Sequence, residues 1–242
     1  MFVFSITGAS YLFLSLVSLL WIFRIFQFWR KENTIVSRLL LLYLIFFQIF
    51  CLITTLGVFF FAKNSGVLKL IVVNASFAQG LMSAVLGYLI FHLKFPKISP
   101  WLGFFIVFSI GFAGAVLSFL KISNPQLEGI SVNWDIVPIA DILRFLTIMI
   151  SILPMGIILI QEGKGAKDPK IKNRSYGLAF LFFAGLVAAA TGFFLEKYLR
   201  FGAISSDISI FFLGLSLLII FLITQKRQSD IYLKEINGEF KY

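Results

Sequence analysis

Apolar residues dominate seven long stretches of the chain, and shorter polar stretches separate them. The apolar stretches cover residues 4–26, 39–62, 70–93, 101–120, 136–161, 176–195 and 208–225. Each has at least about 18 residues, the length that an α-helix needs to cross the hydrocarbon core of a bilayer. In lipid every backbone polar group must be satisfied internally, so such stretches form helices there. The pattern therefore predicts an all-α polytopic membrane protein, a bundle of seven transmembrane helices.

The composition leaves little room for any further domain. Of the 242 residues, 60% are hydrophobic and 13% are charged, and the mean hydropathy is +0.97. Soluble domains have about 25% charged residues. We therefore expect a membrane domain over residues 1–225 and a short cytoplasmic tail over residues 226–242. The tail has mixed charge and a weak apolar stripe, so it either continues the last helix or contacts a partner.

The distribution of Lys and Arg predicts the orientation of the bundle. Fifteen of the 21 basic residues lie in the polar stretches after odd-numbered apolar stretches or, like Arg24, at the end of such an apolar stretch; five lie in the polar stretches after even-numbered ones, and Arg144 lies inside the fifth. Cytoplasmic loops carry the excess of Lys and Arg. We therefore expect the N-terminus outside and the C-terminus in the cytoplasm. No basic residue precedes the first apolar stretch, which favours a retained helix over a cleaved signal peptide. We expect a multi-pass protein of the cell membrane, specifically of a bacterial inner membrane.

The fifth apolar stretch, residues 136–161, contains two opposite charges, Asp141 and Arg144. A charge inside a membrane span costs roughly 2.5–3.5 kcal/mol on the insertion scale, so an ionisable residue there is by default a candidate functional site. Residues three apart share one face of a helix. We expect both side chains to face other helices rather than lipid. Two interpretations stay open at this point, a ligand-binding pair and a structural pair that neutralises itself.

Other polar residues inside the apolar stretches extend this candidate site. They concentrate in the half of the bundle that is expected to face outside, which is the geometry of a pocket open on that side. The candidate ligand-binding residues are Asp141, Arg144, Asn74, Gln79 and Gln48. The polar stretch 121–135 contains Asn-Pro and Glu-Gly turn signals. It is either a lid over the pocket or a plain connector.

Small residues recur at a spacing of four in three of the predicted helices. Such spacing lets helix backbones approach closely in a membrane. The residues are Ser76, Gly80 and Ala84 in the third apolar stretch, Gly111 and Ala115 in the fourth, and Ala184, Ala188 and Gly192 in the sixth. We expect these positions to pack helix against helix.

Several kinds of chemistry lack the residues that they need. The chain has one histidine, His92, and one cysteine, Cys51, so we expect no metal site, no haem and no internal disulfide. The last apolar stretch has no lysine for a retinal Schiff base. No GxSxG, P-loop or HExxH motif occurs. We therefore expect neither an enzyme nor a cofactor. The basic residues lie in loops, where orientation and anionic lipid explain them better than nucleic acid.

The predicted topology resembles the seven-helix input domains of bacterial histidine kinases and related signalling proteins. The resemblance rests on helix number, orientation and the exit of the last helix into the segment QKRQSDIYLKEI. It implies a sensor or receptor-like protein that binds a small ligand, or senses the cell envelope, and signals through a partner on the cytoplasmic face. Two alternatives stay open. One is a small-solute transporter or permease component, and the other is a membrane assembly protein without a ligand.

Overall fold

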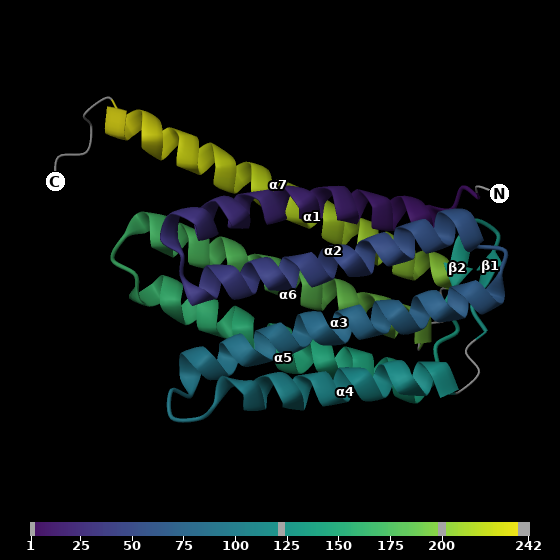
Figure 1. Cartoon of the computed structure of the whole chain (residues 1–242). Coiled ribbons are helices and arrows are strands. Elements are labelled where there is room, and N and C mark those ends of the chain that lie inside the picture. Colours follow the sequence, from purple (N-terminus) through teal and green to yellow (C-terminus); the bar gives the residue numbers. More distant parts are fainter. Residues whose placement is uncertain (1–2, 121–123, 198–201, 237–242) are drawn as a thin grey trace.

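The residues that the structure describes form seven helices and one β-hairpin (Figure 1). This computed structural model describes residues 3–120, 124–197 and 202–236. The helices are α1 (Ile6–Glu32), α2 (Ile35–Phe61), α3 (Ser65–Lys94), α4 (Pro100–Leu120), α5 (Pro138–Gly165), α6 (Pro169–Lys197) and α7 (Ala203–Ile236), with strands β1 (Gln126–Glu128) and β2 (Ser131–Asn133) between α4 and α5. Each helix is long and apolar enough to cross a membrane. The predicted all-α bundle of seven membrane-length helices is therefore confirmed among these residues.

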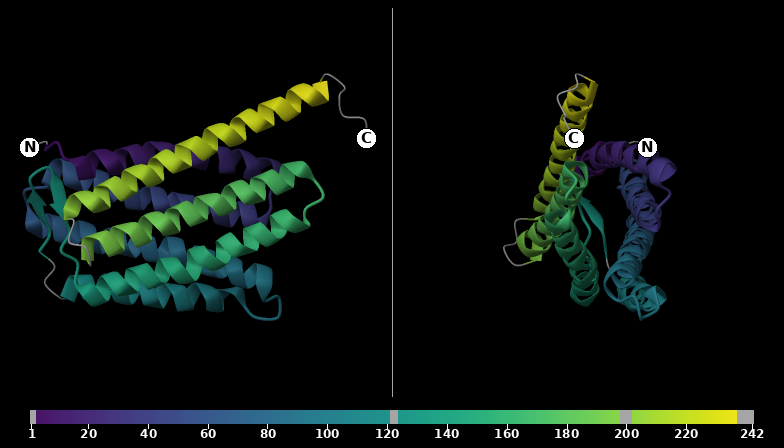
Figure 2. Two further views of the ribbon diagram at one scale, coloured as in Figure 1. Left: turned by 180° about the vertical axis from the view of Figure 1, so that it is seen from behind. Right: turned by 90° about the vertical axis from the view of Figure 1, so that its left-hand side faces the viewer.

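The helices lie in two layers. Seen from one end, α1 to α4 form one curved layer, α5 to α7 form the other, and the hairpin lies between them (Figure 2). Helices that follow one another in the chain are neighbours, and α7 also packs on α1 while α5 also packs on α3. Short connections produce such sequential antiparallel contacts. The two layers therefore enclose an interior that is bordered by six of the helices.

The helices extend beyond the apolar stretches because polar side chains fix their ends. Ser5 caps α1 by accepting a hydrogen bond from the backbone N–H of Gly8, at 3.0 Å. Thr34 caps α2 and Asn64 caps α3 in the same way. A cap of this kind satisfies one of the backbone donors that the first helical turn leaves free. As a result α3 starts at Ser65, five residues before its apolar stretch. At its C-terminal end α1 continues past its own stretch to Glu32, and Asn33 ends it in a left-handed conformation with its backbone N–H bonded to the carbonyl of Trp29.

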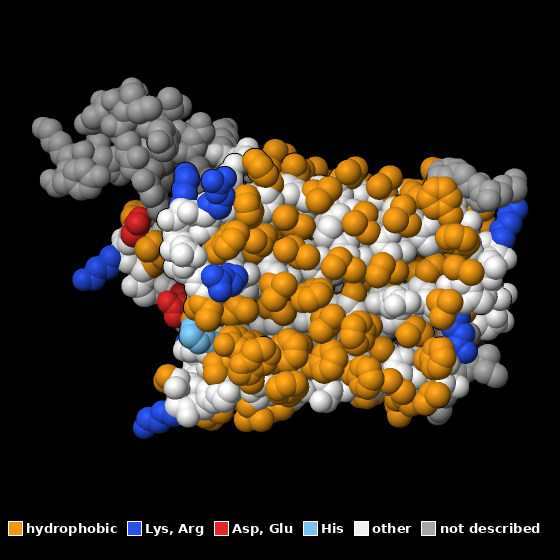
Figure 3. All heavy atoms as spheres, in the orientation of Figure 1, with side chains coloured by type: hydrophobic (Ala, Val, Ile, Leu, Met, Phe, Trp, Pro, Cys, Tyr) orange, Lys and Arg blue, Asp and Glu red, His pale blue; other side chains and the backbone are white. Residues whose placement is uncertain are grey.

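Hydrophobic side chains cover the middle of the outer surface of the bundle. In Figure 3 they extend over the central part of the visible face, and Lys, Arg, Asp, Glu and His lie toward the two ends. Large apolar residues are exposed along this surface, among them Leu16, Phe23 and Phe105, each more than half exposed. A soluble protein rarely exposes so extensive an apolar surface. This exposed apolar surface around the middle of the bundle is suited to contact with lipid, which agrees with a multi-pass membrane protein.

Glycines bring α3 and α4 into close contact, as the spacing predicts. A Cβ atom added to Gly111 would lie 2.7 Å from Cα of Gly80, and one added to Gly87 would lie 2.6 Å from the carbonyl oxygen of Gly103. The small residues of α6 behave differently. Ala188 and Gly192 line a cavity. Ala184 and Ala188 pack against the buried cluster that α1 and α7 form, so in α6 the small residues serve both a helix contact and the wall of the cavity.

The helix α7 is longer than the bundle is thick. Its 34 residues would span about 51 Å at 1.5 Å per residue, whereas about 20 residues cross the hydrocarbon core. Its C-terminal part projects beyond the other helices, and it ends at the opposite end of the bundle from the start of α1 (Figure 1). The tail therefore continues the last helix as far as Ile236. The predicted boundary at residue 225 does not interrupt that helix.

Candidate functional site

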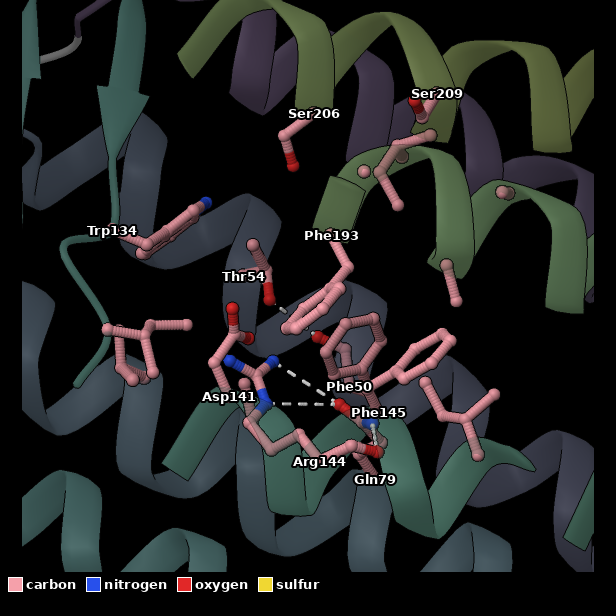
Figure 4. Close-up of a pocket in the computed structure, with 18 of the residues that line it drawn as sticks. Phe50, Thr54, Gln79, Trp134, Asp141, Arg144, Phe145, Phe193, Ser206 and Ser209 are labelled. Carbon is pink, nitrogen blue, oxygen red and sulfur yellow. Dashed lines mark hydrogen bonds between the residues drawn. The ribbon is translucent and has the colours of Figure 1, made fainter. Parts of the chain in front are cut away.

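A cavity of about 170 Å³ lies between the two layers, next to the hairpin. We call it the hairpin-side cavity. Its walls come from α1, α2, α3, α5, α6 and α7 and from the segment after β2. Among the residues that line it, the charged ones are Asp141 and Arg144, and both side chains point toward the cavity in Figure 4. Both are partly buried. The expectation that they face other helices agrees with this placement.

Gln79 of α3 holds Arg144 of α5 in two ways. Its side-chain oxygen accepts hydrogen bonds from Nη2 of Arg144, at 3.2 Å, and from Nε, at 3.4 Å (Figure 4). Its Nε2 donates to the backbone carbonyl of Arg144, at 3.4 Å. Gln79 is 6% exposed. The amide therefore links α3 to α5 and fixes the guanidinium at the wall of the cavity.

Asp141 lies one helical turn before Arg144, in the first turn of α5. That turn has free backbone N–H groups and the positive end of the helix dipole, both of which stabilise a carboxylate. Val137, the residue before the helix, makes no side-chain capping bond. The location of Asp141 thus provides its charge with compensation beyond that of Arg144. A purely self-neutralising pair would not need this location.

A second cavity, of about 160 Å³, continues from the first toward the other end of the bundle. We call it the central cavity. Six residues line both cavities, namely Phe50, Gln79, Ile148, Ala188, Ala189 and Ile210. No charged residue lines the central cavity in the described part of the chain, and most of its wall is Leu, Ile and Phe. Ile25, Leu40, Ile152 and Phe182 belong both to this wall and to the main buried core.

Two of the predicted ligand-binding residues line neither cavity. Asn74 is exposed and donates to the backbone carbonyl of Leu70 in its own helix, at 2.8 Å. Gln48 is buried between α1 and α2, where it donates to Ser15 at 2.7 Å and accepts a hydrogen bond from Ser18. The structure thus brings Asp141, Arg144 and Gln79 together, and it places Asn74 on the outer surface and Gln48 in a helix-packing network.

The hairpin is anchored to the bundle rather than hanging over it. The backbone N–H of Val132 donates to Oγ1 of Thr7, at 2.8 Å, and that hydroxyl donates to Oδ2 of Asp207, at 2.7 Å. Asp207 is 1% exposed and Val132 packs on Val58, Leu68 and Ile71. The hairpin closes one end of the bundle beside the cavity that Trp134 lines, and the choice between a lid and a plain connector for residues 121–135 stays a prediction. Residues 121–123 lie outside the described part.

The sequence gives no direct signal for several residues of the hairpin-side cavity. Phe50, Phe145 and Phe193 line it together with Trp134. Aromatic residues are frequent throughout this chain, 17% of it, so their type alone does not single them out. Thr54 and Ser206 also line the cavity and are labelled in Figure 4. A search for polar residues on the expected outer side includes them, but only the packing brings them to one place.

The described residues contain no group of three or more His, Cys, Asp or Glu side chains suited to a metal ion. Comparison of the chain with models of known protein families, with curated proteins and with solved structures finds no match.

Proposed function

We propose that this chain is an integral membrane receptor-like protein that binds a small molecule in the hairpin-side cavity and passes the signal to a partner. The observation that carries the proposal is the polar group formed by the partly buried Asp141 and Arg144 and the buried Gln79 on the wall of the hairpin-side cavity. Charges inside a span are costly and are retained where they serve a function. The arrangement places them where a ligand can contact them.

The size of the interior space also supports ligand binding. An apolar cavity costs about 24 cal/mol per Å³ in lost packing, so the roughly 160 Å³ of the central cavity corresponds to about 4 kcal/mol. A bundle that served only as an assembly scaffold would gain this free energy by filling the space with larger side chains. The wall instead carries small residues, Gly185, Ala188 and Ala189. An occupant of the space would recover part of the lost contacts.

The helix α7 supports a route from the cavity to a partner. Ser206 and Ser209, near its start, line the hairpin-side cavity, and the same helix continues to Ile236 beyond the far end of the bundle. In the proposed orientation that end lies in the cytoplasm. A ligand that binds two positions of α7 with different affinity would shift the projecting segment. The projecting helix is then the surface that contacts the signalling partner.

The transporter alternative is less well supported than the receptor-like function. The central cavity ends at the buried core that includes Ile25, Leu40 and Ile152. A conduit would need a second opening through this core. Solute counterflow in proteoliposomes measures transport directly, and detectable exchange of a solute would favour the transporter over the receptor.

The test of the proposal is ligand-dependent thermal stabilisation of the purified protein. A panel of sugars, amino acids, nucleosides and carboxylates is screened against the wild type, and the hits are repeated with Asp141→Asn and Arg144→Gln. We expect both variants to fold and to lose the thermal shift. Asn74→Ala is the matched control, because Asn74 lies in the same half of the bundle but outside the cavity. Variants that fail to insert or fold would instead identify the two charges as a structural pair.

A further inference from the structure

The two cavities adjoin, with six lining residues in common, and the chemistry of the wall changes from one to the other. At the hairpin side the wall contains Asp141, Arg144 and Gln79, and at the centre it is almost wholly apolar. The shared residues Phe50, Gln79 and Ile148 mark the transition. A polar solute would fill only the first part of this space, and a hydrocarbon only the second. A molecule with a polar head and an apolar tail matches both parts.

The polar part favours a negatively charged head. A guanidinium has five N–H donors, and the Gln79 oxygen accepts from two of the three nitrogens of Arg144. Gln79 is neutral, and the first turn of α5 stabilises the charge of Asp141. Arg144 is the one cationic side chain among the described residues that line this cavity, so it is the group there that a negatively charged head would bind. A carboxylate fits it best, because the planar fork of Arg binds carboxylates through two parallel hydrogen bonds.

The apolar part favours a single flexible chain. Gly185 lies in its wall, and a Cβ atom added there would meet no other atom within 4 Å. Ala188 and Ala189 extend this open strip toward Arg144, and Ile25 and Leu40 lie at the far end. The central cavity is bordered by α1, α2, α3, α5, α6 and α7 and lies between the two layers, and we call it the slot. An alkyl chain can adapt to the slot, whereas a rigid ring system must match its shape.

We propose that the ligand is a single-chain amphiphile with a carboxylate head, of the fatty-acid class. Its carboxylate binds Arg144 in the hairpin-side cavity, and its alkyl chain lies in the central cavity along the Gly185 strip. This inference rests on the proposed receptor function and names the class of ligand. Gln79 is the positioning residue, because it holds the guanidinium that binds the head.

The first experiment compares head groups on one chain. Dodecanoate, dodecylamine and dodecanol are titrated onto the protein in nanodiscs of zwitterionic lipid, at mildly alkaline pH. We expect dodecanoate to bind most tightly, and Arg144→Gln to weaken it by about tenfold to a hundredfold, the effect of losing a charged hydrogen bond. Asn74→Ala should leave its affinity unchanged. Equal binding of the three probes, or an unchanged affinity in Arg144→Gln, would overturn the proposal.

The second experiment locates the two ends of the chain. Trp134 lines the hairpin-side cavity and Trp21 lines the central cavity, so each reports on one of them. Two variants each keep one of these tryptophans and replace the other three Trp residues of the chain by Phe. A fatty acid brominated next to its carboxylate should quench Trp134 more strongly, and one brominated near its methyl end should quench Trp21. The reverse pattern, or equal quenching by both acids, would contradict the proposed orientation.

A cavity-filling variant separates occupancy of the slot from adsorption at the lipid surface. Gly185→Leu places a side chain in the open space of the slot, and we expect it to abolish quenching of Trp21 and to weaken dodecanoate by at least tenfold. Gly185→Ala fills less of the slot and should have a smaller effect in the same direction. Undiminished binding to both variants would show that the chain does not enter the slot.

The outcomes distinguish this inference from the proposed function. If none of the amphiphiles depends on Arg144, but a soluble compound of the screening panel does, the ligand class is wrong and the receptor function stands. If no compound of either kind depends on Asp141 or Arg144, both proposals fail.

Discussion

The same substitution, Gly→Ala, should have opposite effects at two positions of this bundle. Gly87 lies where α3 meets α4, and an added Cβ atom would be 2.6 Å from the carbonyl oxygen of Gly103 and 2.8 Å from Cγ2 of Val107. Gly185 lies in the wall of the central cavity, where an added Cβ atom meets nothing within 4 Å. Both glycines are inside helices. The pair therefore isolates the effect of packing from that of backbone conformation.

The expected magnitudes follow from two terms. Replacing Gly by Ala inside a helix gains up to about 1 kcal/mol through backbone entropy, and this gain is common to both positions. Overpacking costs typically about 1–3 kcal/mol, and at Gly87 the obstructing atom is backbone, which cannot rotate away. Gly185→Ala should thus be stabilised by up to about 1 kcal/mol. Gly87→Ala should be less stable than Gly185→Ala by about 1–3 kcal/mol, because the common term cancels.

Reversible unfolding by SDS titration in a mild detergent measures this difference. Both variants and the wild type are followed by circular dichroism at one protein concentration and one detergent concentration. Retained helical content before the transition serves as the control for folding. A Gly87→Ala protein as stable as Gly185→Ala would refute the close approach of α3 and α4. A destabilised Gly185→Ala would refute the open space beside α6.

Two further predictions concern the hairpin and the orientation of the bundle. Thr7→Val removes the acceptor of the Val132 amide and the donor to a buried acid of α7, so we expect a loss of about 2–4 kcal/mol in stability and faster hydrogen exchange at Val132, and an unchanged exchange rate there would contradict the anchoring. In a Cys51→Ala background, a membrane-impermeant thiol reagent should label Glu128→Cys in intact cells and Lys164→Cys only after lysis, and the reverse pattern would contradict the proposed orientation.

Part of the candidate site can be predicted from the sequence because charge is costly in lipid. Asp141 and Arg144 stand out in an apolar stretch by that cost alone. Gln79 and Asn74 are equally good candidates for ligand binding from the sequence, since both are amides in the third apolar stretch. They are five residues apart, which at 3.6 residues per turn places them about 140° apart around the helix. Only one of them can face the interior, and in the structure that one is Gln79.

The remaining features depend on contacts between distant parts of the chain. Gln48 is paired with Ser15 and Ser18 on another helix, so its polarity serves packing. The hairpin of residues 126–133 is fixed to the bundle because Val132 and Thr7 meet across 125 residues of sequence. In α6 the spacing of small residues is the same as in α3, yet Ala188 and Gly192 also border a cavity, whereas Gly80 meets Gly111 of α4 directly. The sequence pattern is local, so it does not predict whether a given face of a helix meets another helix or a cavity.

By itself, the sequence determined that this chain forms seven membrane-length helices and that one of them carries a pair of charges. Hydrophobic length and the cost of an unpaired backbone in lipid are properties of each segment alone, so they can be evaluated without knowing the neighbours. The tertiary structure alone decided which polar side chains meet, where the bundle is closed by the hairpin, and where space remains between the layers. These depend on how each helix is rotated about its axis, and that rotation is set by the packing of all seven together.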